Sequence, residues 1–101
     1  MCNYKFRDRK EDRVQIKSFI ITNKLGIHVR PATQLVTTAN KFISDISIKK
    51  DELEIDAKGI MGILMLAASQ GSEIVIRAEG KDAREAIDEL GRLIEERFGE
   101  E

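Results

Sequence analysis

Four short segments alternate hydrophobic and polar residues, and this pattern predicts β-strands with one buried face. In the first segment Phe19 and Ile21 share one face, while Val14, Ile16 and Ile20 share the other. The four segments are residues 14–23, 44–50, 52–57 and 72–80. Only Asp51 and Glu52 lie between the last residue of the second segment and Leu53, the first apolar residue of the third, so we expect a tight hairpin there, although its turn lacks the usual glycine.

Three other segments have the patterns of helices. From Pro31, which is suited to the first turn, apolar residues recur at helical spacing. Residues 58–69 are apolar almost all round; their Met and Leu content and the following Gln70-Gly71 favour a short buried helix over a buried strand. A long amphipathic helix is predicted after Asp82, which forms a capping-box pattern with Glu85. The apolar positions of the first and last helices are Ala32, Leu35, Val36 and Ala39, and Ile87, Leu90, Ile94 and Phe98.

The predicted elements follow one another in the order βαββαβα. Such an order favours an α+β fold in which helices cover one face of a mostly antiparallel sheet. The chain of 101 residues is long enough for one domain, which we assign to residues 14–101. Residues 1–13 are mostly charged and show no apolar period, so we expect a flexible N-terminal extension there.

Charge and composition exclude several classes of function. Residues 1–13 carry a net charge of +2, which leaves about −3 on the rest of a chain whose formal net charge is −1. A nucleic-acid-binding face is therefore not expected. The sequence has no basic and apolar leader, and its longest apolar run is too short to cross a bilayer. With Cys2 as the one cysteine, these features fit a cytoplasmic protein without disulfides.

The chemistry of the chain centres on His28, which is its only histidine, and on Arg30 and Pro31. Proline at a helix start places His28 at or just before the helix N-terminus, where backbone N–H groups lack partners. The positive end of the helix favours a neutral imidazole, and the free N–H groups suit an anion. Arg30 adds donors for phosphate. These features together predict a phosphohistidine site.

Other interpretations of His28 stay open on spacing alone. A lone histidine in a loop is more often a surface residue or an N-cap. A metal site lacks a second histidine, and a hydrolase lacks a nucleophile signature. We therefore expect no metal and no cofactor. The sequence from Gly59 to Gly62 also matches the G-x-x-G loop of KH RNA-binding modules, but it lacks the basic neighbours that such a loop needs.

Two motifs resemble those of a known family: GIHVRPAT at residues 26–33 and DAKGIMGILMLAASQGSEI at residues 56–74. Together they resemble the histidine-containing phosphocarrier family (HPr) of the bacterial phosphoenolpyruvate-dependent sugar phosphotransferase system, over residues 14–98. The resemblance implies an open-faced β-sandwich of four antiparallel strands under three helices. It implies that His28 takes a phosphoryl group on Nδ1 from enzyme I and passes it to an enzyme IIA. Arg30 would support the phosphoryl group.

The resemblance also assigns supporting roles around His28. Val29 and Arg30 would lend backbone N–H groups, and Pro31 would set the helix start. Partner docking would involve Thr33, Ile60, Met61 and Leu64, of which an exposed flexible methionine suits a surface that meets several partners. Ile63 we assign to the core. The chain would act as a monomeric relay and not as an enzyme.

The chain departs from the family pattern at two positions. Val29 stands where the family usually has a small residue, so its branched side chain could narrow the choice of partner. Gly59 stands where many relatives carry a regulatory serine, so a serine-phosphorylation switch cannot operate there. Gly59 therefore leaves open an alternative: a regulatory homologue, of a nitrogen-related branch or one that only binds partners, outside sugar uptake.

Overall fold

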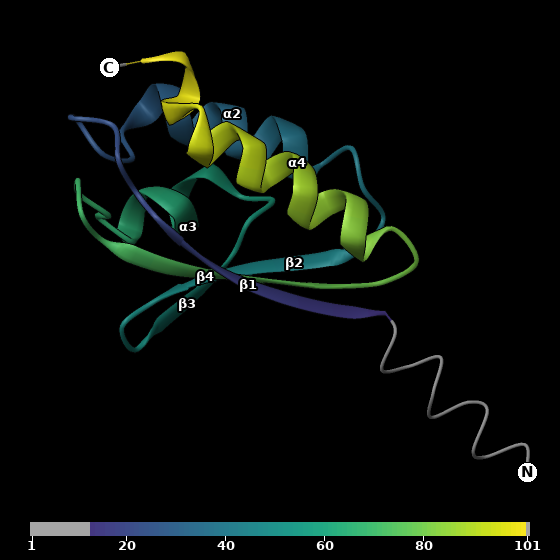
Figure 1. The fold of residues 1–101 in the computed structure, drawn as a ribbon. Coiled ribbons are helices and arrows are strands. Elements are labelled where there is room, and N and C mark those ends of the chain that lie inside the picture. Colours follow the sequence, from purple (N-terminus) through teal and green to yellow (C-terminus); the bar gives the residue numbers. More distant parts are fainter. Residues whose placement is uncertain (1–12, 101) are drawn as a thin grey trace, which may run out of the picture.

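The computed structural model describes residues 13–100, in which one antiparallel sheet is covered on one face by helices (Figure 1). The strands are β1 (Val14–Ile20), β2 (Asp45–Lys50), β3 (Leu53–Asp56) and β4 (Glu73–Glu79). The helices are α2 (Val29–Ala39), α3 (Ile60–Met65) and α4 (Ala83–Glu95), followed by a short 3-10 helix, η1 (Arg97–Gly99). The predicted order βαββαβα and the α+β class are confirmed. The predicted extension lies outside the described residues apart from Arg13.

The sheet has the strand order β1-β4-β2-β3, and all neighbours are antiparallel. Phe19 of β1 pairs with Ile74 of β4, and both side chains are buried under the helices. On the same strand Ile16 and Ile20 are exposed. Since side chains alternate along a strand, the predicted face assignment of β1 is confirmed. The opposite face of the sheet carries no described helix (Figure 1).

Close packing joins α4 to the sheet. Gly91, on the buried face of α4, lies over the ring of Phe19, and a Cβ at Gly91 would come within 2.6 Å of the Phe19 Cε1 atom. A glycine inside a helix costs about 1 kcal/mol relative to alanine. Here it lets the helix axis approach the aromatic ring of β1, which explains its place in an otherwise regular amphipathic helix.

The β2–β3 hairpin forms as predicted, and its turn works without glycine. Asp51 takes a left-handed conformation with φ of 55°, which short polar side chains adopt more readily than others. Residues 60–65 form a helix, so the helical interpretation of that apolar segment is confirmed. Its apolar side chains are not all buried, however. Ile63 is in the core, while Met61 and Met65 are exposed.

The start of α2 and the capping of α4 differ from the prediction, although α4 begins after Asp82 as expected. α2 begins at Val29, two residues before Pro31. Pro31 still falls in the first turn, where a missing N–H costs nothing because that turn has no acceptors. The Asp82 side chain does not cap α4, so the capping-box prediction is wrong. Its carboxylate instead accepts hydrogen bonds from the backbone N–H groups of Ile43 and Ser44 and from the Ser44 hydroxyl.

The end of α4 also differs. The helix ends at Glu95, and Phe98, predicted to continue its apolar stripe, lies in the 3-10 turn with φ of 56°. Phe98 is nevertheless buried. The hydrophobic spacing therefore predicted its burial correctly, but a turn of the backbone achieves that burial instead of a further helical turn.

Asp82 makes the stability of the fold depend on pH. Partial desolvation raises the pKa of Asp82, but the hydrogen bonds from Ser44 and Ile43 outweigh it and lower the pKa below 3.8. Such a carboxylate contributes its full stabilisation at pH values above the pKa that it has in the unfolded chain. This stabilisation is lost as the pH falls through the lower pKa that it has in the folded protein. We predict that Asp82→Asn lowers the free energy of unfolding by about 1 kcal/mol at pH 7.

Urea denaturation at pH 7 and at pH 3 would check this prediction. The loss caused by Asp82→Asn should shrink at the lower pH, because the wild-type carboxyl is becoming protonated there. Asp88→Asn, an exposed position on the same helix, is the matched control and should have little effect. An equal loss at both pH values would contradict the assigned role of the ionised carboxylate.

Candidate functional site

His28 is the N-cap residue of α2. Its backbone is extended (φ −110°, ψ −166°), and its carbonyl oxygen accepts the first hydrogen bond of the helix, from Ala32 N–H at 2.9 Å. The imidazole makes no capping hydrogen bond to the backbone of the helix. Its side chain is 37% exposed. The sequence-based placement of His28 at the start of this helix agrees with the structure.

The loop before His28 is fixed to the segment after α3. Ile27 N–H donates to the carbonyl oxygen of Ala68 at 2.8 Å, and the Ile27 side chain is buried. Gly26 is left-handed with φ of +68°, and a Cβ there would come within 2.5 Å of the Ala68 carbonyl oxygen. Only glycine allows this close approach. The loop therefore places the start of α2 beside the end of α3.

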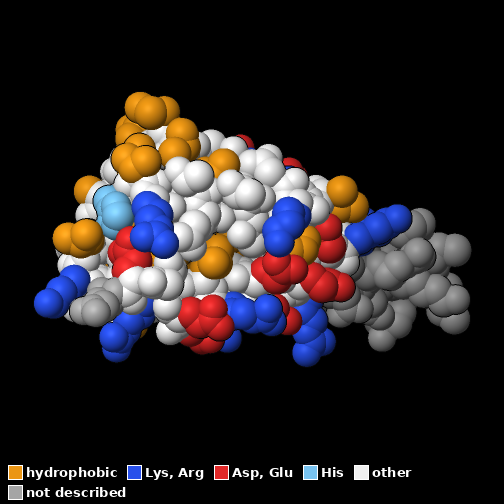
Figure 2. Space-filling model, turned by 90° about the horizontal axis from the view of Figure 1, so that it is seen from above, with side chains coloured by type: hydrophobic (Ala, Val, Ile, Leu, Met, Phe, Trp, Pro, Cys, Tyr) orange, Lys and Arg blue, Asp and Glu red, His pale blue; other side chains and the backbone are white. Residues whose placement is uncertain are grey.

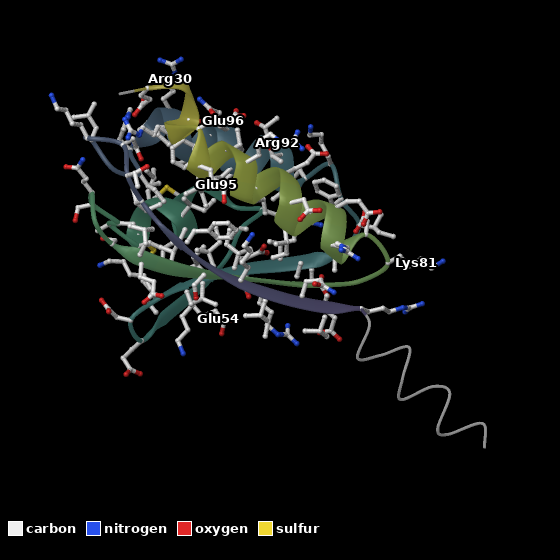
Figure 3. The ribbon with its side chains drawn as sticks, viewed as in Figure 1. Arg30, Glu54, Lys81, Arg92, Glu95 and Glu96 are labelled. Atoms are coloured by element: carbon white, nitrogen blue, oxygen red, sulfur yellow. The ribbon has the colours of Figure 1, made fainter. Side chains whose placement is uncertain are left out.

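The first turn of α2 presents donors and positive charge. Val29 and Arg30 are its first residues, so their N–H groups have no acceptor within the helix, and Pro31 has no N–H at all. Arg30 is exposed, and within residues 13–100 its guanidinium forms no ion pair. Figure 3 shows Arg30 at the end of the molecule where the chain terminates. An anion beside His28 would meet both the N–H groups and the guanidinium.

A carboxylate from the far end of the chain contacts the imidazole. The Glu100 oxygens lie 3.0 and 3.2 Å from Nε2 of His28, and Asn23 Nδ2 donates to the same carboxylate at 3.0 Å. Desolvation raises the pKa of Glu100, but the hydrogen bonds from His28 and Asn23, and the charge of Arg30, lower it by more. Glu100 is thus an ionised partner of His28 at neutral pH.

Exposed hydrophobic side chains surround this site. Figure 2 shows the single His side chain near one end of the molecule, with basic and acidic side chains beside it and hydrophobic ones nearby. Met61 and Met65 of α3 are 69% and 64% exposed. We call the exposed set Leu25, Val29, Met61 and Met65 the apolar rim.

The other predicted docking residues are less available. Ile60 and Leu64 are half-buried and pack against the core. Thr33 is exposed, and its hydroxyl donates to the Val29 carbonyl oxygen at 2.8 Å within α2. Gly59 is the N-cap of α3 with nothing within 4 Å of a Cβ, and the Gly59–Gly62 stretch belongs to a helix start instead of a loop between two helices. The KH interpretation is therefore wrong.

The His28 ring lies at the surface. Two hollows of the surface, lined mostly by polar residues of the sheet and its turns, do not include it. In the part of the chain that the structure describes, no three His, Cys, Asp or Glu side chains come together as a metal site. No described helix is long and apolar enough to cross a membrane. The partly exposed imidazole suits contact with another macromolecule better than enclosure of a small substrate.

Sequence reasoning missed four residues of this site: Asn23, Leu25, Met65 and Glu100. Asn23 and Glu100 are 5 and 72 residues from His28, and no local pattern connects Glu100 to it. Met65 follows Met61 by four residues, which is one helical turn, so their shared face was a usable signal. Asn23 had a weaker signal, because a buried asparagine in a loop usually serves backbone groups.

Comparison with known proteins gives consistent matches. The family described as PTS HPr component phosphorylation site matches residues 15–96. The phosphocarrier protein HPr of Xylella fastidiosa (strain 9a5c) is 45% identical over 81% of this chain and 92% of its own length. The HPr-like protein Crh of Bacillus subtilis (strain 168) is 41% identical over 72% of this chain and 86% of its own.

The solved structures agree with this result. The crystal structure of HPr-C-His from Thermoanaerobacter tengcongensis superposes with a TM-score of 0.83 at 48% identity, covering 86% of this chain and 98% of that one. The HPr structure from Bacillus anthracis gives a TM-score of 0.77 at 42% identity, covering 80% of this chain and 96% of that one. The open-faced arrangement predicted from the sequence is therefore confirmed.

Gly26 offers a test of how the loop holds His28. Gly26→Ala adds a side chain where the backbone is left-handed and the Ala68 carbonyl is too close. We expect it to lower the free energy of unfolding by about 1–3 kcal/mol and to shift the NMR signals of the His28 ring. Gly71→Ala, also at a positive φ but with nothing within 4 Å, is the control and should leave the ring signals in place. Unchanged ring signals in Gly26→Ala would contradict the role of this contact.

Proposed function

The chain belongs to the HPr family of phosphocarrier proteins, and from that premise we propose that His28 Nδ1 accepts a phosphoryl group and passes it to another protein. The observation that carries the proposal is the position of His28 at the start of α2, beside the unpartnered N–H groups of Val29 and Arg30. The imidazole is a competent nucleophile when neutral. The helix terminus and the Arg30 guanidinium supply positive potential where the phosphoryl oxygens would lie.

The proposed transfer needs no cofactor within this chain. The Nδ1 lone pair forms the new P–N bond as the phosphoryl group leaves its donor, and the reverse step regenerates the imidazole. Catalysis then rests on positioning and electrostatics, with the partner protein supplying the remaining groups. We propose enzyme I as donor and an enzyme IIA as acceptor, in the cytoplasm.

The apolar rim is the proposed docking surface for these partners. Its methionines can adapt to more than one partner surface because their side chains are flexible. A relay must release each partner after transfer, which a small interface allows. Val29 belongs to the rim and is 62% exposed, so its branched side chain would contact the partner directly. Its backbone N–H is unaffected by that branching.

A regulatory role is the second candidate. The similarity to Crh, a protein of Bacillus subtilis that is named for catabolite repression, supports this second role. A purely regulatory homologue would bind partners without passing a phosphoryl group to a sugar-linked enzyme IIA. Incubating the phosphorylated chain with such a protein and following the label separates the two roles.

His28→Ala should abolish phosphorylation by enzyme I, magnesium and phosphoenolpyruvate. His28 is the only histidine, so an acid-labile phosphoryl group found on the chain by mass spectrometry at neutral pH should be absent from the variant. The urea unfolding midpoint should change little, because the His28 side chain is partly exposed and does not belong to the hydrophobic core. Acid-labile phosphate on the His28→Ala protein would refute the assignment.

Arg30→Ala should slow phosphorylation by about tenfold without preventing the phosphohistidine from forming, because the variant loses one of several positive groups around the phosphoryl oxygens. Initial rates with enzyme I measure the effect. Lys81→Ala is the control. It removes the same charge from an exposed residue just before the start of α4, far from Arg30 (Figure 3). Equal rates for the two variants would exclude a local role for Arg30.

A further inference from the structure

The two nitrogens of the His28 ring have different surroundings. Nε2 lies 3.0 Å from Oε2 and 3.2 Å from Oε1 of Glu100. An ionised carboxylate can only accept hydrogen bonds, so Nε2 must carry the hydrogen. In a neutral imidazole the lone pair then belongs to Nδ1, the atom that the proposed function requires as nucleophile.

Glu100 is itself held in place by Asn23. The Asn23 Nδ2 group donates to Glu100 Oε1 at 3.0 Å and to the Gly26 carbonyl oxygen at 2.7 Å. Because both neighbouring groups are acceptors, the NH₂ group of the Asn23 amide, and not its oxygen, must face them. Asn23 is fully buried, and its Oδ1 has no hydrogen-bond partner within residues 13–100. The donors of this side chain, and not its acceptor, therefore account for its place under the His28 loop.

The backbone leading to Glu100 is shaped to reach the site. Arg97, Phe98 and Gly99 all have positive φ, at 56°, 56° and 75°, and they turn the chain back after α4. The buried Phe98 ring anchors this turn, and Gln34 of α2 donates to the Phe98 carbonyl oxygen at 3.2 Å. Figure 1 shows the C-terminal segment near α2. Left-handed conformations at non-glycine residues are costly, so tertiary contacts must hold the segment there.

We infer that Glu100 is a positioning residue for phosphoryl transfer at His28. Its carboxylate holds the ring with Nε2–H inward and Nδ1 outward, and balances the positive charge that the ring gains on phosphorylation. This inference rests on the proposed function of His28 and deepens it. The side chain of Glu100 is 13% exposed, so its charge faces the ring with limited competition from water.

The charges in the proposed step balance without a further reactant. Attack by Nδ1 of the neutral ring forms the P–N bond and breaks the bond between phosphorus and its donor. Both ring nitrogens are then substituted, one by phosphorus and one by hydrogen, so the ring is cationic. The proton stays on Nε2 and faces the Glu100 carboxylate, as in the carboxylate–histidine pairs of other nucleophilic sites. Onward transfer returns the ring to its neutral form.

Glu100→Gln tests the inference, since it keeps the shape of the side chain and removes the charge. Glu96→Gln is the matched control. It removes the same charge near the end of α4, from an exposed residue that has no hydrogen bond to His28 or Asn23 within residues 13–100 (Figure 3). The first readout is the ring itself: long-range proton–nitrogen NMR at pH 8.5 identifies which nitrogen carries the hydrogen. The second is the equilibrium of phosphoryl exchange with enzyme I.

In the wild type and Glu96→Gln we expect a hydrogen-bonded Nε2–H signal. In Glu100→Gln we expect that signal to weaken through exchange with water. The exchange equilibrium should shift about two- to fivefold against the phosphorylated chain, as expected for a partly exposed charge pair. If Glu100 served only the stability of the fold, a Glu100→Gln protein with the wild-type free energy of unfolding would show the wild-type Nε2–H signal and the wild-type exchange equilibrium.

Each failure has its own signature. If the wild type takes up no phosphoryl group and behaves like His28→Ala, the proposed function fails and the inference falls with it. If the wild type is phosphorylated and Glu100→Gln matches Glu96→Gln in both readouts, only the inference is overturned. If Glu100→Gln is phosphorylated more favourably than the wild type, the carboxylate opposes the incoming phosphoryl group and the inference is also overturned.

Discussion

The hydrogen bond from Ile27 N–H to the Ala68 carbonyl oxygen is the constraint on which the site depends. It joins the loop before α2 to the segment after α3, and Gly26 lets the two backbones come close enough to form it. This contact adds to the packing between α2 and α3 and sets where the chain enters α2. It thereby holds the start of α2, with His28, beside the end of α3, which carries Met65.

The sheet explains why that surface faces outward. The described helices lie on one face of the sheet, and the start of α2 points to one end of the molecule instead of into the core (Figure 1). An imidazole that lies partly exposed at the surface cannot exclude water unaided. It suits a chain whose chemistry is completed by a partner, because docking itself removes the water and brings the remaining groups. The architecture and the proposed relay therefore agree.

Local patterns in the sequence predicted most of the fold. Alternation identified the strands, and the spacing around Leu35 and Leu90 identified the helices, because burial of one face imposes a period. They failed where a tertiary contact replaced a local one. Asp82 looked like a helix cap but its carboxylate accepts hydrogen bonds from the loop that precedes β2. Phe98 looked like a further helical turn, but its burial is achieved by a left-handed backbone that no periodicity encodes.

The candidate site divides in the same way. His28 and Arg30 could be predicted because the chemistry of a helix start is local in sequence. Glu100 could not, since it reaches the ring only through the turn after α4. The surroundings of the His28 ring thus depend on the turn after α4 and not only on how α2 begins. In the proposed transfer, the folded C-terminal segment holds Nε2 of the ring through Glu100. The entropy of orienting Nδ1 is then already lost before any partner docks. A phosphocarrier can be preorganised in this way, by a hydrogen bond within the chain to the ring nitrogen that does not react.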